Sequence, residues 1–573
     1  MTRPATSAIP DCRSTPNVLG GKANHGPNIY SPDYKDIAPR VAFAYTLGSS
    51  GKTVVNGGAG IVYDRTVINA INFLQDQISY LFFNQQISQF GSGAGAAASL
   101  AADTRVGANL AYSATLNPAP IAVTTPYTPY IDGSGTPYGL AAGETSFVIS
   151  PTLRDPYSIT MNFGIQQELP GHMVMKLNYA GRLGRRLIAD ADASQVIDVP
   201  DYTGKSNQSM AGAFAGLTKQ LRAQAPVTAE PWFENVLAPG SGAAIGSAFG
   251  LPIYNNTDLV AYFAGQYALR GDISDSIYVL NYYSYFYGLN YFPANVGIPS
   301  QFGTNAYLTN MGNSNYNGML LTLDKNLSGG LRYEFNYTWS HSIDNTSVSA
   351  NANSLFTNSN FICDVLHPRA CRGSSDFDVR QEITSNFQYD LPFGRGRAFA
   401  GNAPRWADEA IGGWGFSGLP SYRTGLAQSA YSDAYLASFD NADPAIFTGN
   451  RADLRAKVNK NTSSKTVYMF AGGLAGSQKV LSEFRGPIGI EYGNRNILRS
   501  PGAFNFDAGL GKTFPILEDK LNLKFRADAF NVLNHPAFGG GALNIVTNAS
   551  AFGQIGGTSN SARVAQFSLR LEF

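Results

Sequence analysis

The sequence has little charge and no long apolar run. Only 14% of its 573 residues are charged, and the formal net charge is +1. A chain so near neutrality has no basic surface for nucleic acid, so no such partner is expected. No stretch approaches the ~18 unbroken apolar residues of a membrane-spanning helix. The first seven residues, Met1–Ser7, lack the apolar core of an export signal.

Cysteine and histidine are scarce as well. Of the three cysteines, Cys363 and Cys371 lie close together in a polar segment, far from Cys12. The pair either closes a small disulfide loop in an oxidising compartment or remains two free thiols. Only His367 lies near them, which falls short of a structural zinc set. The sequence therefore predicts no metal site and no cofactor.

Two short motifs are weak candidates for chemistry. Asp376 and Asp378 flank Phe377, but two carboxylates are too few to predict a calcium site. Ser340-His341-Ser342 contains a hydroxyl beside an imidazole, yet it lies at the end of a predicted strand, where polar residues are expected anyway. We therefore predict that the protein is not an enzyme.

The clearest pattern in the chain is the strict alternation at 564–573. Its apolar positions are Ala565, Phe567, Leu569, Leu571 and Phe573, and its polar positions are Gln566, Ser568, Arg570 and Glu572. Alternate side chains of a strand point to opposite faces, so this strand has one apolar and one charged face.

The same period of two predicts ten further strands. They cover residues 40–47, 53–63, 157–165, 173–179, 316–325, 331–340, 379–391, 414–425, 504–514 and 520–529. Between them, residues 208–224 are compatible with a short helix, and the aromatic run near Tyr282 is compatible with more strands.

Short and long connections alternate along these strands. A transmembrane β-barrel has this arrangement, with short periplasmic turns and long extracellular loops, whereas a soluble sandwich has no reason to sort its loops. The predicted fold class is therefore all-β, an antiparallel transmembrane β-barrel in the cell outer membrane. The whole chain, residues 1–573, is read as barrel domain.

The two faces of the predicted strands differ in chemistry. Residues 331–340 place several aromatic rings on one face, which suits a membrane-interface girdle against lipid. Charged residues on the other faces are expected to line the lumen, mostly as pairs between neighbouring strands. These residues are Arg380, Glu382, Lys524, Arg526, Asp528 and Arg570.

Eleven strands are an odd number, whereas single-chain bacterial barrels have an even one. Together with the missing export signal, this count predicts a chain that is the C-terminal part of a larger protein or a truncated gene model.

The last strand is also expected to guide assembly. It should pair with residues 520–529 on one side and seek the first barrel strand on the other. Its regular apolar row resembles the signal by which barrel-assembly machinery recognises its clients, since an exposed terminal strand is a template for strand addition. The residues of this row are Phe567, Leu569, Leu571 and Phe573.

Several ordered segments resemble the barrel of Oar-like TonB-dependent receptors. They are Ala38-Pro-Arg-Val-Ala-Phe-Ala-Tyr45, Gly51-Lys-Thr-Val-Val-Asn-Gly-Gly-Ala-Gly-Ile-Val-Tyr-Asp-Arg65, Asn315-Tyr-Asn-Gly318, Tyr337-Thr-Trp-Ser-His-Ser-Ile-Asp344, Ser375-Asp-Phe-Asp-Val-Arg380, Leu391-Pro-Phe-Gly-Arg395 and Phe530-Asn-Val-Leu-Asn-His-Pro-Ala-Phe-Gly539. The resemblance implies a 22-stranded barrel, preceded by a signal peptide, a carboxypeptidase-regulatory-like sandwich domain and a plug. None of these preceding parts, and no TonB box, is identified in this sequence.

Three functions follow as hypotheses. The first is binding and uptake of a large solute, with TonB engaged only through a plug that this chain does not show. The second is a structural or adhesive role of the long loops at the cell surface. The third is a soluble, secreted β-rich binding protein. The solute itself is not readable, because specificity resides in loops.

Overall fold

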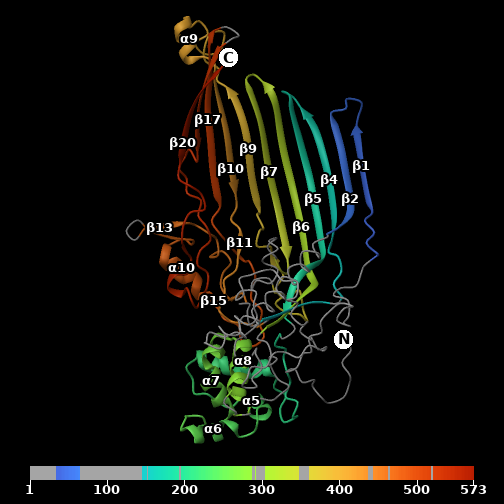
Figure 1. Cartoon of the computed structure of the whole chain (residues 1–573), viewed down its shortest axis with the longest axis vertical. Coiled ribbons are helices and arrows are strands. Elements are labelled where there is room, and N and C mark those ends of the chain that lie inside the picture. The colour runs from blue at the N-terminus through green and yellow to red at the C-terminus, as the bar shows by residue number, and fades with distance from the viewer. Residues whose placement is uncertain are drawn as a thin grey trace, which may run out of the picture.

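The computed structural model describes residues 34–64, 145–150, 152–192, 195–286, 289, 291, 304–347, 361–436, 443–461, 465–517 and 521–573. Within these ranges, one large sheet carries the fold, and helices gather at one end of it (Figure 1). No helix in the described ranges is both long and apolar enough to cross a membrane.

The sheet runs in the order β1-β2-β4-β5-β6-β7-β9-β10-β17-β18-β20, with every neighbour antiparallel. These eleven strands are the eleven that the alternation predicts. Their bounds are Arg40–Leu47, Thr53–Tyr63, Tyr157–Leu169, Met173–Asp192, Thr304–Ser328, Leu331–Asp344, Gln381–Asp390, Trp414–Arg423, Ala503–Leu517, Leu521–Phe530 and Val564–Glu572. Two short strands join its side, β3 (Thr145–Ile149), parallel to β6, and β8 (Gly373–Ser374), paired with β7.

The register places the apolar positions of successive strands on one shared face. A row across the sheet shows this directly: Tyr45, Val55, Ile165, Leu177, Leu321, Tyr337, Ile383 and Tyr422 lie opposite one another in turn. The next row on the other face contains Gln166, Lys176, Thr322, Asn336, Thr384 and Ser421. A one-residue slip would exchange the two faces, so this continuity fixes the register of the eleven-stranded sheet, which we call the wall.

Connections differ sharply between the two ends of the sheet. At the short-turn end, β1–β2, β4–β5 and β6–β7 are joined by a few residues each. The β9–β10 turn is longer and contains the helix α9 (Arg405–Ile411). At the opposite, long-loop end, β5 and β6 continue well beyond the predicted strands, to Asp192 and from Thr304.

Helices at the long-loop end correct two expectations. They are α4 (Met210–Arg222), α5 (Pro231–Val236), α6 (Ser241–Phe249), α7 (Asn256–Arg270) and α8 (Ile273–Phe286). The helix expected within 208–224 is confirmed as α4. The strands expected near Tyr282 are wrong, because that run is α8, and the all-β class misses this helical region.

Helical periodicity explains the α8 correction. Ile273, Ile277, Leu280 and Ser284 are buried and recur every three or four residues on one face. Their face packs into a core with Trp232 and other side chains of α4 to α7. Two polar residues of the run, Asn281 and Ser284, are buried as well, so the run has the spacing of a packed helix rather than that of strands.

A second compact region forms from the chain between β10 and β17 and from residues after β18. It contains α10 (Gly473–Ser482) and the short strands β11 (Ala427–Gln428), β12 (Ile446–Phe447), β13 (Asn459–Asn461), β14 (Thr466–Tyr468), β15 (Phe484–Arg485), β16 (Leu498–Arg499) and β19 (Gln554–Ile555). The one-turn 3-10 helix Ala549–Ala551 completes it. Its own apolar core includes Met469, Phe470 and Phe552.

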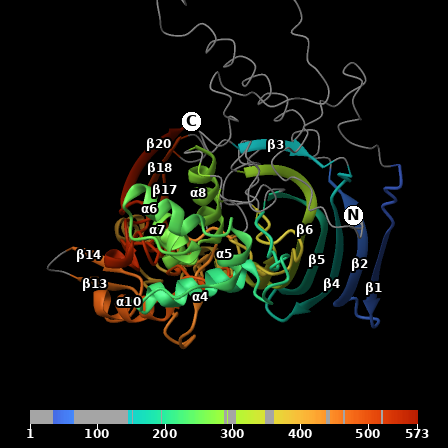
Figure 2. The same cartoon turned by 90° about the horizontal axis from the view of Figure 1, so that it is seen from below.

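The two outer regions are joined to each other. The Arg222 guanidinium of α4 donates to the carbonyl oxygens of Gly486 and Pro487, at 3.1 and 3.0 Å. The Ser274 amide of α8 donates to the Tyr435 carbonyl. Figure 2, seen from below, shows the helices lying across the end of the curved sheet.

The last strand pairs as predicted with β18, from Asn522↔Glu572 to Phe530↔Val564. Among the described residues, no pairing joins β20 to β1, so both strands form edges of the sheet. The barrel of 22 strands remains a prediction.

Candidate functional site

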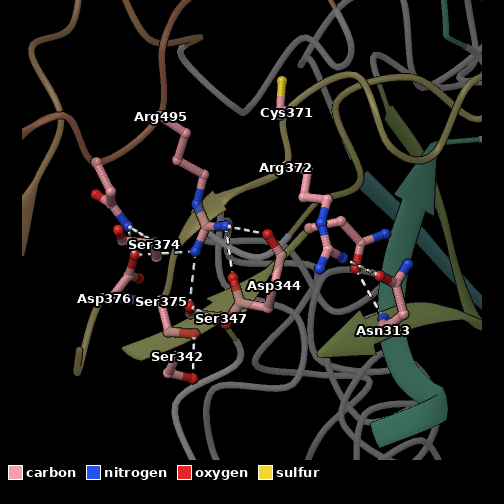
Figure 3. Close-up of polar contacts among 12 residues, drawn as sticks. Asn313, Ser342, Asp344, Ser347, Cys371, Arg372, Ser374, Ser375, Asp376 and Arg495 are labelled. Carbon is pink, nitrogen blue, oxygen red and sulfur yellow. Dashed lines mark hydrogen bonds and ion pairs between the residues drawn. The ribbon is translucent and has the colours of Figure 1, made fainter. Parts of the chain in front are cut away.

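The candidate site lies at the long-loop end, where three segments meet. They are the end of β7, the link 373–380 between β8 and β9, and residues 495–499, which include β16. Hydrogen bonds and ion pairs between these segments build one polar network at the long-loop end of the wall (Figure 3).

The carboxylate of Asp378 anchors one side of the network. Its side chain is fully buried and accepts from the Ser342 amide at 2.6 Å and from the Arg380 guanidinium at 3.0 Å. The Arg499 guanidinium donates to the same carboxylate and, at 2.6 Å, to the Asp378 carbonyl oxygen. A buried charge with this many donors is fully compensated, so Asp378 is a structural joint rather than a free ligand.

Arg495 joins the other side. Its guanidinium donates to Asp344 Oδ1 at 2.6 Å, to Ser347 Oγ at 2.6 Å and to Asp376 Oδ1 at 3.1 Å. Its side chain is 12% exposed and that of Asp344 is 3% exposed. Burial lowers the pKa of the Arg495 guanidinium, but the Asp344 and Asp376 carboxylates outweigh this and hold it above its usual value. The guanidinium is therefore a fixed positive charge.

Asp376 is the member of the network that faces outward. Its side chain is 59% exposed. Besides Arg495, Asn496 holds it with a 2.6 Å hydrogen bond from Nδ2 to Oδ1. The carboxylate is thus fixed in position and still accessible, which is the combination that a ligand-binding group needs.

A cavity of about 400 Å³ opens beside Asp376. Its lining residues are Asp376, Ala427, Gln428, Ser429, Tyr431, Asn496, Gly541, Leu543, Asn544 and Asn548. A second cavity, of about 230 Å³, shares Asp376, Ala427 and Gln428 with the first and adds Arg423 at its side. We name the two together the Asp376 cavity.

The lining chemistry is mostly neutral and polar. Amides, a hydroxyl and a phenol surround the larger cavity, and Asp376 is its one charged lining residue among the described residues. Such a surface offers hydrogen bonds and one negative charge, which fit a hydroxyl-rich or cationic molecule better than an anion. Within the described ranges, no three His, Cys, Asp or Glu side chains are grouped as a metal site.

The two clustered cysteines lie near this region. In the structure, Cys363 and Cys371 form a disulfide with a Cα–Cα distance of 6.1 Å. Tyr492 packs against it, and the Tyr492 hydroxyl accepts from Gln195 Nε2 at 3.2 Å. Gln195 Oε1 in turn accepts from the Val365 amide at 2.8 Å. The bridge lies within the β7–β8 loop, and the contacts of Tyr492 and Gln195 join this loop to the other outer segments.

Two of the predicted lumen charges lie near the cavity: Arg380 pairs with Asp378 of the network, and Glu382 lies opposite Arg423, which lines the smaller cavity. Glu382 also lies opposite Thr338. Lys524 and Arg570 both pair with Glu572, at 2.7 and 3.5 Å, and Arg526 pairs with Asp528 at 2.8 Å. The predicted lumen charges of β18 and β20 all lie on the face opposite Phe525 and Leu569, namely Lys524, Arg526, Asp528 and Arg570.

Sequence reasoning did not find Arg495, Asn496 and Arg499, because they lie in a region without periodicity. From the sequence, Asp376 and Asp378 are only a weak calcium candidate. The sequence does contain a signal for this network. Arg495 and Arg499 precede β17, and Asp376 and Asp378 precede β9. That signal becomes meaningful only once the sheet order is known, since it places the two strands on either side of β10.

With this geometry in hand, the chain can be compared with known proteins. It belongs to the outer membrane beta barrel domain family, whose model matches residues 3–566. The protein is therefore located in the cell outer membrane, and the soluble, secreted alternative is wrong. No curated protein matches the chain.

This chain is similar to part of each of several solved outer-membrane receptor structures. The outer membrane transporter YddB from Escherichia coli is 10% identical, with a TM-score of 0.35, and the match covers 94% of this chain and 40% of that one. The ferric enterobactin receptor PfeA from Pseudomonas aeruginosa is 10% identical, with a TM-score of 0.33 and coverage of 93% and 39%. The siderophore receptor PirA from Acinetobacter baumannii is 8% identical, with a TM-score of 0.32 and coverage of 93% and 40%. The chain thus spans about 40% of the length of these proteins.

Proposed function

We propose that this protein is the wall and outer region of a TonB-dependent receptor of the Oar-like kind, which binds a large solute for uptake across the outer membrane. The observation that carries the proposal is the Asp376 cavity, set among outer segments above an eleven-stranded wall. In this proposal the polar face, with Arg380, Glu382, Lys524, Arg526, Asp528 and Arg570, lines the lumen. The apolar face meets lipid.

The lining of the cavity narrows the class of solute. A fixed carboxylate beside amides and Tyr431 favours a neutral, hydroxyl-rich or cationic molecule. Coupling of uptake to TonB would pass through a plug domain. No group of the cavity suggests catalysis, and we propose none.

Binding to the purified chain in detergent tests the proposal. Titration calorimetry with neutral oligosaccharides, oligoamines and oligocarboxylates should give heats for one of the first two classes only. Asp376→Asn keeps the size of the side chain and should weaken that binding about tenfold, because it removes a charged hydrogen-bond acceptor. Asp453→Asn, an exposed pair with Lys479 outside the cavity lining, is the matched control. Binding of oligocarboxylates alone, or equal affinity of both variants, would reject the site.

The adhesive alternative predicts a different result. Its surface would be the outside of the helical region, where Phe249 and Tyr254 are exposed. Loss of cell attachment on Phe249→Ser with Tyr254→Ser, with no solute bound by the wild type, would favour adhesion over uptake.

We further propose that the row Phe567, Leu569, Leu571 and Phe573 is read by the barrel-assembly machinery. These side chains are all exposed along one face of β20. Phe573→Asp should leave export intact but reduce the amount of protein in the outer membrane, as measured by fractionation. Normal membrane levels of this variant would remove the recognition role.

A further inference from the structure

The β9–β10 turn, residues 391–413, differs from the other connections at the short-turn end. We call it the rim turn. It carries α9, in which no residue is buried. Four of its large apolar side chains are exposed, namely Phe393, Phe399, Trp406 and Ile411, and Trp406 reaches 76%. Figure 1 places α9 beyond the end of the wall, close to the C-terminus.

The rim turn is fixed against the apolar face of the wall. Trp414, Lys512, Phe525 and Leu569 lie opposite one another in successive strands, so they share this face. Two of these side chains hold the last turn of α9: Trp414 Nε1 donates to the Ala410 carbonyl at 2.9 Å, and Lys512 Nζ donates to the Glu409 carbonyl. The helix is thereby held on the side that meets lipid rather than over the lumen.

Lys512 shows how the contact is adapted to a membrane boundary. It is a cation on the apolar face, yet it is only 7% exposed. Its ammonium lies 4.8 Å from the centre of the Phe514 ring and 5.6 Å from that of Trp414. The two aromatic rings pack against the side chain of Lys512, and its ammonium group donates to the Glu409 carbonyl of the rim turn. A lysine behaves in this way where hydrocarbon gives way to headgroups.

Charge on the rim turn is arranged for an anionic partner. Arg405 pairs with Glu409 at 3.3 Å, and Asp408 Oδ1 accepts from the Arg395 amide at 2.5 Å, so both acids are occupied. The side chains of Arg395 and Arg397 are exposed, and no hydrogen bond or ion pair holds either one within the described part of the chain. Two free guanidiniums thus stand beside exposed aromatic rings.

We propose that the rim turn is a membrane-interface anchor that binds anionic phospholipid headgroups. Trp406, Phe393, Phe399 and Ile411 enter the boundary of the acyl chains, and Arg395 and Arg397 bind lipid phosphates. The occupant follows from continuity with the lipid-facing wall and from charge complementarity. The inference requires only that the apolar face meets lipid, so it does not depend on the Asp376 cavity or its solute.

Quenching by brominated lipids tests this anchor in the full chain. The protein is reconstituted in phosphatidylcholine vesicles that contain a minor fraction of phosphatidylglycerol, with bromine on the acyl chains of one lipid or the other. The emission of Trp406 is the difference between wild type and Trp406→Phe. We expect it to be quenched, and more strongly per brominated molecule when the bromine is on phosphatidylglycerol.

Two double variants distinguish headgroup binding by Arg395 and Arg397 from a general effect of the protein's positive charge. In Arg395→Gln with Arg397→Gln, the ratio of phosphatidylglycerol to phosphatidylcholine quenching should fall to one, while quenching itself persists. Arg451→Gln with Arg455→Gln removes the same charge from exposed positions at the long-loop end and should leave the ratio unchanged. A heat-modifiable gel shift confirms that each variant is folded.

Absence of quenching would place Trp406 outside the membrane and overturn the anchor. A ratio that is one in the wild type, or that survives loss of Arg395 and Arg397, would overturn headgroup binding by these arginines. Failure of solute binding at the Asp376 cavity would affect neither the conclusion on the membrane anchor nor the conclusion on headgroup binding.

Discussion

The wall and the outer regions of this molecule use charge in opposite ways. On the wall, the side chains of the pairs Lys176–Asp324 and Lys524–Glu572 are 30–47% exposed and join neighbouring strands. In the outer network, Asp344 and Asp378 are nearly or fully buried and bind arginines more than a hundred residues away. Exposed pairs contribute little, whereas a broken buried pair leaves an uncompensated charge. Ion pairs therefore add little to the stability of the wall, whereas a few buried ion pairs add to the apolar cores in stabilising the outer regions.

The largest expected effect comes from removing Arg495. Arg495→Met leaves Asp344 buried without its partner and should destabilise the outer regions by about 3–5 kcal/mol. Native-state proteolysis of the protein in liposomes measures this, since outer segments become cleavable while the strand signal in far-UV circular dichroism persists. Arg526→Met, in an exposed wall pair, should change stability by no more than about 1 kcal/mol. Equal effects of the two substitutions would remove the contrast between the regions.

A charge on the apolar face tests the wall itself. Leu569→Arg should cost roughly 2–4 kcal/mol if the position lies near the bilayer midplane. Ser568→Arg, one residue earlier and on the polar face, should be much milder. The folded fraction in liposomes, read from a heat-modifiable gel shift, gives both values. If Ser568→Arg proves the worse of the two, the assignment of the faces is reversed.

The disulfide affects the outer regions alone. Cys363 and Cys371 are separated by 8 positions, so Cys363→Ser with Cys371→Ser should cost about 2–3 kcal/mol, by the loop-closure estimate. The same protease assay, with and without reductant, should show faster cleavage of the outer segments and an unchanged wall. Cys12→Ser is the control, because it removes a thiol and leaves the bridge. Insensitivity of the wild type to reductant would argue that the bridge adds nothing.

A smaller effect, and one that depends on pH, is expected at Asp190. This residue lies seventeen positions beyond the start of β5, past the roughly ten residues that span a bilayer. Neither carboxylate oxygen has a hydrogen-bond partner among the described residues, and burial raises the pKa of Asp190 to about 8 from a usual 3.8. The fold therefore binds a proton that the unfolded chain releases, and stability falls as pH rises from about 4 to about 8.

Replacement of Asp190 should reverse that loss. Asp190→Leu should gain about 1–3 kcal/mol near pH 8, with the gain smallest near pH 4. Asp190→Asn keeps the shape and should also flatten the pH dependence. Urea unfolding in detergent at several pH values measures both variants. A wild type whose stability rises between pH 5 and 8, relative to Asp190→Asn, would show that the carboxyl is ionised and stabilised.

The sequence predicted the wall well because a strand with two different faces repeats every two residues. Residues 331–340 and 564–573 carry that pattern in full. A short turn sets the pairing of 331–340 with the preceding strand, whereas 564–573 pair with β18 across a long connection, with matching faces. The outer regions follow no single period. The helical spacing of Ile273, Ile277 and Leu280 becomes evident only when the core that α8 packs into is known. Arg495 pairs with Asp344 across 151 positions. The sequence alone also leaves the pairing of Cys363 with Cys371 open, because that pairing depends on how the loop between them folds.

The joint between the two outer regions has a consequence for the time course of folding. Contacts within α4 to α8 are local, so this region can fold early and by itself. Arg222 reaches Pro487 across 265 positions, so this contact closes a long loop that contains β6 to β10, and we expect it to form once these strands have paired and shortened that loop. The joint should therefore be the last part to gain protection from hydrogen exchange during refolding. Its completion would report that the intervening strands are assembled.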